Sequence, residues 1–128
     1  PGVRDVVETI KAAGKGLGIV TSKARKGTAK GLKSGGLEGF FTAIVAADDV
    51  EKHKPNPTPV LKAMELLNAD AERTVFIGDS PHDMAAGRAA GVLTAAALWG
   101  PFDKNDLAHL SPNFWLSEPA DILSLDAE

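Results

Sequence analysis

The fold of this chain is decided by the stretch Val75-Phe76-Ile77-Gly78-Asp79-Ser80-Pro81-His82-Asp83. Its apolar first half predicts a buried strand over residues 74–78. Serine followed by proline is a typical helix start, so we expect a helix over residues 81–90. A strand that passes through a short polar loop into a helix is the repeating unit of an α/β fold.

The rest of the chain alternates in the same way between apolar runs and amphipathic segments. The predicted strands cover residues 17–20, 42–47, 74–78, 92–98 and 113–116, and the predicted helices cover 3–13, 24–34, 56–68, 81–90 and about 119–123. Glycines that can end a helix follow three of these segments, at Gly14, Gly35 and Gly91. This order predicts an α/β fold of the Rossmannoid kind, a parallel sheet covered by helices on both faces, in a single domain over residues 1–128.

Composition limits the classes of function that this chain can serve. Its 128 residues are 44% hydrophobic and 24% charged, as in an ordinary globular domain. A net charge of −3 gives no general attraction to nucleic acid or to an anionic membrane, and no apolar run has the length of a bilayer span. The sequence has no cysteine, so hard cations such as Mg²⁺ are the metals that its side chains suit best. We expect a cytoplasmic protein with no nucleic-acid or membrane partner.

Polar side chains follow three of the predicted strands. Thr21 and Ser22 end the first strand, Lys54 lies in the loop beyond the second, and Asp79 ends the third, with Asp83 four residues later. In a parallel sheet these positions share one edge, where ligands bind. Hydroxyl, ammonium and carboxylate groups together predict a phosphate site with a metal site beside it, because phosphoryl transfer requires neutralised oxygens.

These residues match three motifs in order. An apolar strand ends in hydroxyl residues at Gly18-Ile19-Val20-Thr21-Ser22-Lys23, a lysine precedes Pro-x-Pro at Lys54-Pro55-Asn56-Pro57, and Gly-Asp-Ser-x-x-Asp closes the stretch quoted first. With them the chain resembles the haloacid dehalogenase superfamily, close to its phosphoglycolate-phosphatase-like branch. The resemblance covers essentially the whole chain.

The resemblance implies a magnesium-dependent phosphatase that hydrolyses a small phosphorylated metabolite, a phosphomonoester, through an aspartyl-phosphate intermediate. It implies that Thr21, with Ser22, binds the phosphoryl oxygens. It implies that Lys54 neutralises both the phosphoryl group and the attacking carboxylate. Asp79 would ligate Mg²⁺, and Asp83 would support the metal directly or through water.

One motif of the resembled family is missing from these 128 residues. It is an Asp-x-Asp pair that ends the central strand of the sheet, between the strands that end here in Thr21 and Asp79, and it supplies the nucleophile and the general acid. Because the sequence begins with Pro1, we expect a fragment of a longer protein that is inactive by itself. Without the central strand, the two neighbouring strands pair directly, another segment fills the slot, or unpaired edges are exposed and favour association.

Other functions remain open within and beyond the family. The resemblance also covers pyrophosphatases, sugar-phosphate mutases such as β-phosphoglucomutase, and dehalogenases, although dehalogenases have little use for the metal that Asp79 and Asp83 suggest. A protein of another class, a non-catalytic remnant that binds phosphate or a partner, is the second hypothesis.

Several residues also have purely structural interpretations. Asp83 lies three residues after Ser80, the spacing of a capping box. The alternative role of Thr21 is to cap the following helix, and the alternative for Lys54 is an ordinary solvated lysine without a part in the site. For Asp48 and Asp49 we expect a solvated turn. Five cations around one helix are expected to form a solvated face rather than a nucleic-acid face, namely Lys23, Arg25, Lys26, Lys30 and Lys33. His53 and His82 are assigned no role. Residues 99–102 either shape the rim of the site or pack against the core.

Overall fold

The computed structural model describes residues 3–52, 54 and 56–126. It contains five strands and five α-helices in the predicted alternation. The strands are β1 (Gly18–Val20), β2 (Ala43–Val45), β3 (Val75–Gly78), β4 (Leu93–Ala97) and β5 (Phe114–Leu116). The helices are α1 (Val3–Ala12), α2 (Arg25–Ser34), α3 (Thr58–Leu67), α4 (Pro81–Ala90) and α5 (Lys104–Leu107). The predicted α/β fold is confirmed, with strands somewhat shorter than the apolar runs.

Local signals set the helix ends. Helix α3 begins at Thr58 after the N-cap Pro57, and the side-chain oxygen of Asn56 accepts a hydrogen bond from the Thr58 amide at 3.0 Å. The same helix ends at Asn68, in the left-handed conformation with φ of 53°. Gly91 ends α4 with φ of 82°, a value that glycine adopts without steric cost. The left-handed glycine acts within a few residues, which is why the sequence alone predicted the end of α4 at Gly91.

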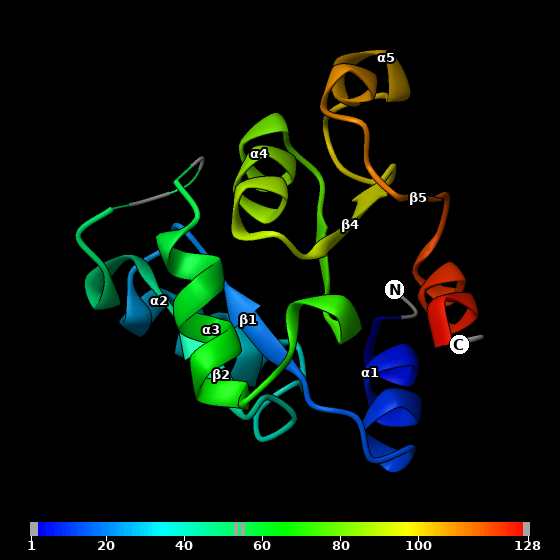
Figure 1. Cartoon of the computed structure of the whole chain (residues 1–128). Coiled ribbons are helices and arrows are strands. Elements are labelled where there is room, and N and C mark those ends of the chain that lie inside the picture. Colours follow the sequence, from blue (N-terminus) through cyan, green and yellow to red (C-terminus); the bar gives the residue numbers. More distant parts are fainter. Residues whose placement is uncertain (1–2, 53, 55, 127–128) are drawn as a thin grey trace.

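The parallel strands form two separate sheets (Figure 1). In the first, β1 pairs with β2, with Gly18 opposite Ala43. In the second, the order is β3-β4-β5, with Gly78 opposite Ala96. Within the described residues no strand pairing joins β1 to β3, and no other strand lies between them. Of the three expected arrangements, the described part of the chain therefore adopts the one with unpaired edges; association through these edges stays a prediction.

Two helices connect the sheets. Helix α3 packs against both β1 and β2, and it also contacts α4, which in turn packs against β3 and β4. Val60 of α3 and Ala86 of α4 are buried together with Val92, and Phe76 of β3 packs against this cluster. Burial of this apolar surface, rather than strand pairing, connects the two sheets.

A second buried cluster lies under the other side of α4. Met84, Ala96 and Leu107 are each 0% exposed, and Trp115 of β5 packs against them. Through Leu107, the cluster also contains helix α5. The first turn of α4 carries Asp83, and the close-packed core formed by this cluster therefore holds that turn in place.

The C-terminal third differs from the prediction in detail. The segment expected to be a helix near residues 119–123 is a 3₁₀ helix over Pro119–Asp126, which lies beside α1. Helix α5 was not predicted, although its start carries a capping signal. Asp103 accepts a hydrogen bond from the Asp106 amide at 3.1 Å, and Asp106 accepts one from the Asp103 amide at 3.0 Å. A four-residue helix has too little periodicity to be recognised from its apolar residues.

Among the described residues, no helix is both long and apolar enough to cross a membrane.

Candidate active site

The site is built at the junction of β3 and α4. The Ser80 hydroxyl oxygen accepts a hydrogen bond from the Asp83 amide at 3.2 Å, and Pro81 follows as the first helical residue. The Asp83 carboxylate turns back and accepts a hydrogen bond from the Asp79 amide at 3.2 Å. Ser80 thus caps α4 as predicted, whereas the returning carboxylate bonds to Asp79 instead of completing the capping box with Ser80.

Lys54 and Asp83 form an ion pair in this junction. The Lys54 Nζ atom lies 2.6 Å from Asp83 Oδ1, and each side chain is only 12% exposed. The same ammonium lies 5.8 Å from the centre of the Phe76 ring. The structure therefore brings together two of the predicted site residues that are 29 positions apart in the sequence. A pair so poorly hydrated interacts more strongly than one at the open surface.

Asp79 lies beside this pair in a small cavity. A volume of about 230 Å³ is lined by Ile77, Gly78, Asp79, Asp83, Ala97 and Trp99. Of its two carboxylates, Asp83 is engaged by Lys54 and by a backbone amide, which leaves Asp79 as the better donor for a cation. Within the described residues no three acidic or histidine side chains gather around one point. Asp79 and Asp83 carry the hard oxygen donors that Mg²⁺ prefers, and their role in metal binding stays a prediction.

Thr21 and Ser22 lie apart from this junction, at the end of β1 in the other sheet. The Thr21 hydroxyl oxygen accepts a hydrogen bond from the Lys23 amide at 3.1 Å, so it organises the turn after the strand. Thr21 is half-buried and Ser22 is exposed. Among the described residues no hydrogen bond connects either hydroxyl to Lys54, Asp79 or Asp83, and their role in phosphate binding stays a prediction.

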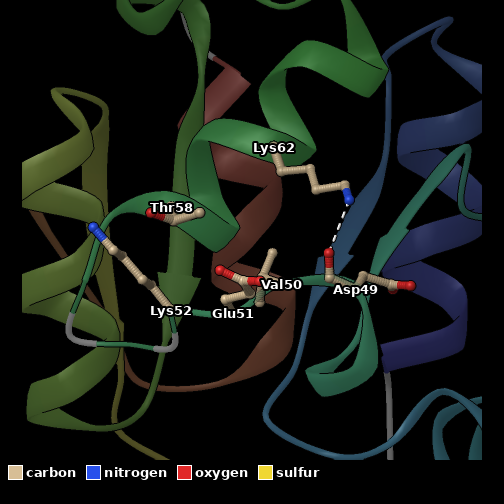
Figure 2. A pocket seen from close by; sticks show the side chains of 6 residues that line it. All are labelled: Asp49, Val50, Glu51, Lys52, Thr58 and Lys62. Carbon is tan, nitrogen blue, oxygen red and sulfur yellow. Dashed lines mark hydrogen bonds between the residues drawn. The ribbon is translucent and has the colours of Figure 1, made fainter.

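A larger open hollow lies near the loop that leads to Lys54 (Figure 2). Its volume is about 370 Å³, and it is lined by Asp49, Val50, Glu51, Lys52, Thr58 and Lys62. The Lys62 ammonium donates a hydrogen bond to the backbone oxygen of Asp49 at 2.9 Å and so ties α3 to the 3₁₀ turn Ala47–Asp49 that follows β2. No motif in the sequence marked this hollow, since its residues come from a turn and one helix face.

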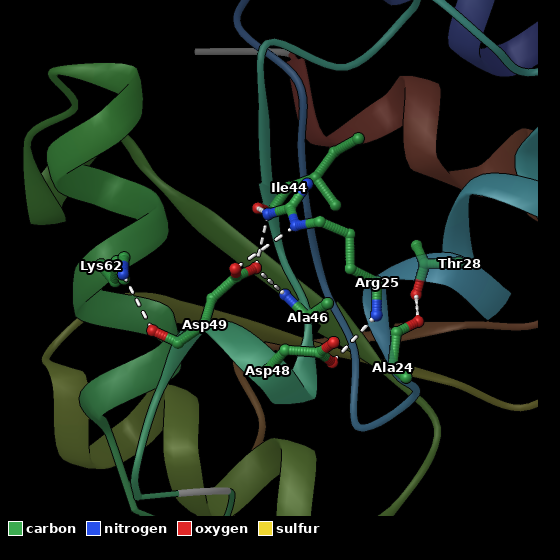
Figure 3. Close-up of polar contacts among 8 residues, drawn as sticks. All are labelled: Ala24, Arg25, Thr28, Ile44, Ala46, Asp48, Asp49 and Lys62. Carbon is green, nitrogen blue, oxygen red and sulfur yellow. Dashed lines mark hydrogen bonds and ion pairs between the residues drawn. The ribbon is translucent and has the colours of Figure 1, made fainter.

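Asp48 is exposed, as expected for a solvated turn, but the Asp49 side chain is only 21% exposed, and Arg25 contacts both carboxylates (Figure 3). The Arg25 guanidinium donates hydrogen bonds to the Asp49 carboxylate and to the backbone oxygen of Ile44, the latter at 2.8 Å. Asp48 accepts a hydrogen bond from the Arg25 amide at 3.0 Å. Arg25 is exposed like the rest of this helix face, as expected, and in addition it fastens the start of α2 to β2 and to the 3₁₀ turn Ala47–Asp49 that follows it.

This fastening changes the acidity of Asp49. The hydrogen bond from Arg25, followed by the one from the Ala46 amide, holds the pKa of the Asp49 carboxyl below its usual value. A group whose pKa is lowered by folding stabilises the protein above its unfolded pKa, and this contribution is lost as the pH falls through the folded value.

We expect Asp49→Asn to destabilise the chain at neutral pH, and the difference from the wild type to shrink below about pH 4. Urea unfolding of both proteins between neutral and acidic pH measures this. Asp70→Asn, in which the replaced carboxylate is exposed, serves as the control and should show little pH-dependent difference. A gap between Asp49→Asn and the wild type that stayed constant with pH would contradict the assigned cause.

The remaining candidates have simple positions. His82 is exposed on the first turn of α4, and His53 and Pro55 lie outside the described residues. Trp99 is 42% exposed and Phe102 is 37% exposed, so this segment is not buried by packing, and Trp99 lines the cavity of Asp79.

Comparison with known proteins identifies one family. The family model described as haloacid dehalogenase-like hydrolase matches residues 1–97. Among curated proteins, the pyrophosphatase PpaX of Anoxybacillus flavithermus is 42% identical over 123 residues, which are 96% of this chain and 57% of that protein. The chain therefore spans little more than half the length of this relative.

Solved structures give the same result for the fold. A Lactobacillus plantarum protein provisionally assigned as a phosphoglycolate phosphatase is 35% identical, with a TM-score of 0.87 over 98% of this chain and 59% of its own. A Thermotoga maritima protein provisionally assigned as a β-phosphoglucomutase is 28% identical, with a TM-score of 0.89 over 98% of this chain and 58% of its own. The predicted resemblance is thus confirmed at the level of family and fold.

Proposed function

Because this chain belongs to the haloacid dehalogenase-like hydrolase family, we propose that it is the larger part of the catalytic core of a magnesium-dependent phosphatase. The proposed reaction is hydrolysis of a small phosphomonoester through an aspartyl-phosphate intermediate. The observation that carries the proposal is the ion pair between Lys54 and Asp83 at 2.6 Å, nearly buried and directly beside Asp79. This observation supports the proposal because it brings an ammonium group next to the two carboxylates that line the cavity.

Each residue has a distinct role in this proposal. Lys54 offsets the negative charge of the phosphoryl group and of the attacking carboxylate, and Asp83 holds the ammonium in position through their 2.6 Å contact. Thr21 and Ser22 donate hydrogen bonds to the phosphoryl oxygens. Asp79 binds Mg²⁺, which when bound neutralises charge that develops on the transferred group.

The attacking carboxylate is not assigned to any residue of this chain. The 128 residues contain no Asp-x-Asp sequence. The acidic group at Asp70 and Glu72 precedes β3, at the opposite end of the strand from Asp79. We therefore propose that these 128 residues by themselves do not catalyse hydrolysis.

Pyrophosphate is the second candidate substrate, because several curated relatives, with 40–42% identity, are named pyrophosphatase PpaX. The structures provisionally assigned to phosphoglycolate phosphatase and β-phosphoglucomutase support a small phosphorylated metabolite in general. A non-catalytic phosphate-binding role is the alternative from another class. The net charge of −3 disfavours nucleic acid as a partner, and we propose a cytoplasmic location.

A chimera tests the proposed function. The part of the Anoxybacillus flavithermus pyrophosphatase that this chain does not match would be joined upstream of it, a design that the 42% identity permits. We expect Mg²⁺-dependent hydrolysis of an aryl phosphate, of phosphoglycolate or of pyrophosphate by the chimera and none by the chain alone. Asp79→Asn in the chimera should lower kcat by about 100-fold.

The matched control is Asp70→Asn, which removes an exposed carboxylate away from the site. Turnover by the pure 128-residue chain would show that the proposed inactivity is wrong. A folded chimera with no turnover of any of the three substrates would favour the non-catalytic role, and full activity of Asp79→Asn would refute the metal role of this residue.

A further inference from the structure

The loop after β4 touches the Asp79 side chain at a glycine. A Cβ atom added to Gly100 would lie 2.4 Å from Asp79 Oδ2 and 2.5 Å from Asp79 Cβ. Both distances are shorter than any van der Waals contact between these atoms, and the second involves an atom that cannot swing away without a change of the backbone. The Asp79 side chain therefore lies directly against the backbone of Gly100, in space that any other residue would fill.

The same arrangement occurs at the other carboxylate of the cavity. A Cβ atom on Gly78 would lie 2.3 Å from Asp83 Cβ and 2.7 Å from Asp83 Oδ2. A Cβ on Gly87 would be similarly crowded, at 2.7 Å from the Thr94 side chain, but it would meet no carboxylate, and a Cβ on Gly27 or Gly31 of α2 would meet no atom within 4 Å. The Asp79 and Asp83 side chains thus each pack directly against the backbone of a glycine.

Trp99 adds a wall to the same cavity. It directly precedes Gly100 and follows the fully buried end of β4, yet its side chain remains 42% exposed. It lines the cavity together with Asp79 and Asp83. One short loop therefore provides both the space for the Asp79 carboxylate and an aromatic face beside it.

We propose that Gly100 is a positioning residue for Asp79: its missing side chain fixes where the carboxylate lies and thereby sets the affinity of the site for a divalent cation. The inference rests on the proposed function, in which Asp79 binds Mg²⁺. The physical reason is that a metal ligand displaced by even part of an ångström binds its cation less well.

The first experiment measures the position of the carboxylate without any metal. The chain is labelled with ¹³C-aspartate, and the Asp79 carboxyl signal is assigned by its loss in Asp79→Asn. We expect Gly100→Ala to shift this signal while those of Asp103 and Asp106 stay unchanged. The matched control is Gly31→Ala, the same chemical change in open space, which should leave the Asp79 signal in place. An unmoved Asp79 signal in Gly100→Ala would overturn the inference.

The second experiment measures cation binding. Tb³⁺ is titrated into the chain, and its luminescence is excited through Trp99, with Mg²⁺ as competitor and Trp99→Phe as the control for the other indole, Trp115. We expect the midpoint of the titration to rise by about tenfold in Gly100→Ala and to stay unchanged in Gly31→Ala. Circular dichroism should show the same fold in both variants, which separates positioning from misfolding.

Asp79→Asn distinguishes the failure of this inference from the failure of the proposed function. If Asp79→Asn abolishes the Mg²⁺-sensitive signal but Gly100→Ala titrates like the wild type, the positioning role of Gly100 is refuted and the metal role of Asp79 stands. If Asp79→Asn titrates like the wild type, the metal role of Asp79 is refuted. The proposal that Gly100 sets the affinity for the cation is then refuted as well.

Discussion

Lys54→Met is expected to lower the free energy of unfolding by about 2–3 kcal/mol, because breaking a buried ion pair leaves the other charge without a partner. The Lys54 and Asp83 side chains are each still 12% exposed, so we expect a smaller loss of stability than for a fully buried ion pair. Methionine retains most of the apolar stem, so the loss reports on the charge rather than on packing. Urea unfolding at neutral pH measures it.

Two further variants make this prediction specific. Lys52→Met removes an exposed ammonium two residues earlier and should change the stability by no more than about 0.5 kcal/mol. The double variant Lys54→Met/Asp83→Asn removes both charges and should recover a large part of the loss, since no unpaired charge then remains. Equal losses in Lys54→Met and Lys52→Met would show that the pair is not effectively buried.

Met84→Ala is expected to cost about 3 kcal/mol through the loss of buried apolar surface and the cavity left behind. The Met84 side chain is 0% exposed and packs with Ala96 and Leu107 beneath the first turn of α4. Because Asp83 is its neighbour in sequence, the same change loosens the support of the site. Thermal or urea unfolding reports the loss.

Leu66→Ala is the control for this change, as it removes an apolar side chain that is 51% exposed on α3. It should cost about 0.5 kcal/mol or less, because little surface is transferred back to water. If both variants lost the same stability, the cluster under α4 would not be the close-packed core that the structure shows.

These predictions address different parts of one arrangement. The core under α4 fixes the helix start, the helix start presents Asp83, and Asp83 holds Lys54 beside Asp79. A defect at any of these levels is transmitted to the ammonium group and the carboxylate that the proposed chemistry needs. The site therefore depends on packing that lies outside it.

Much of the fold and the identity of the candidate residues followed from the sequence, because the contacts that decide them are local. The helix α4 begins at Pro81 and ends before Gly91 as predicted, since an N-cap, a proline and a left-handed glycine act within a few residues. The alternation of strands and helices follows from the periodicity of apolar residues. The motif around Asp79 pointed to the family that the comparison then confirmed.

The sequence placed Lys54 and Asp83 at one edge of the sheet, but only the tertiary structure decided which distant side chains make direct contact. The pairing of Lys54 with Asp83, of Arg25 with Asp49 and of Gly100 with Asp79 joins residues 29, 24 and 21 positions apart, as their numbers give. The division of the strands into the sheets β1-β2 and β3-β4-β5 was likewise decided by tertiary packing. Such contacts depend on how whole elements pack against one another, and a side chain's own sequence neighbours carry no information about the partner that packing brings to it.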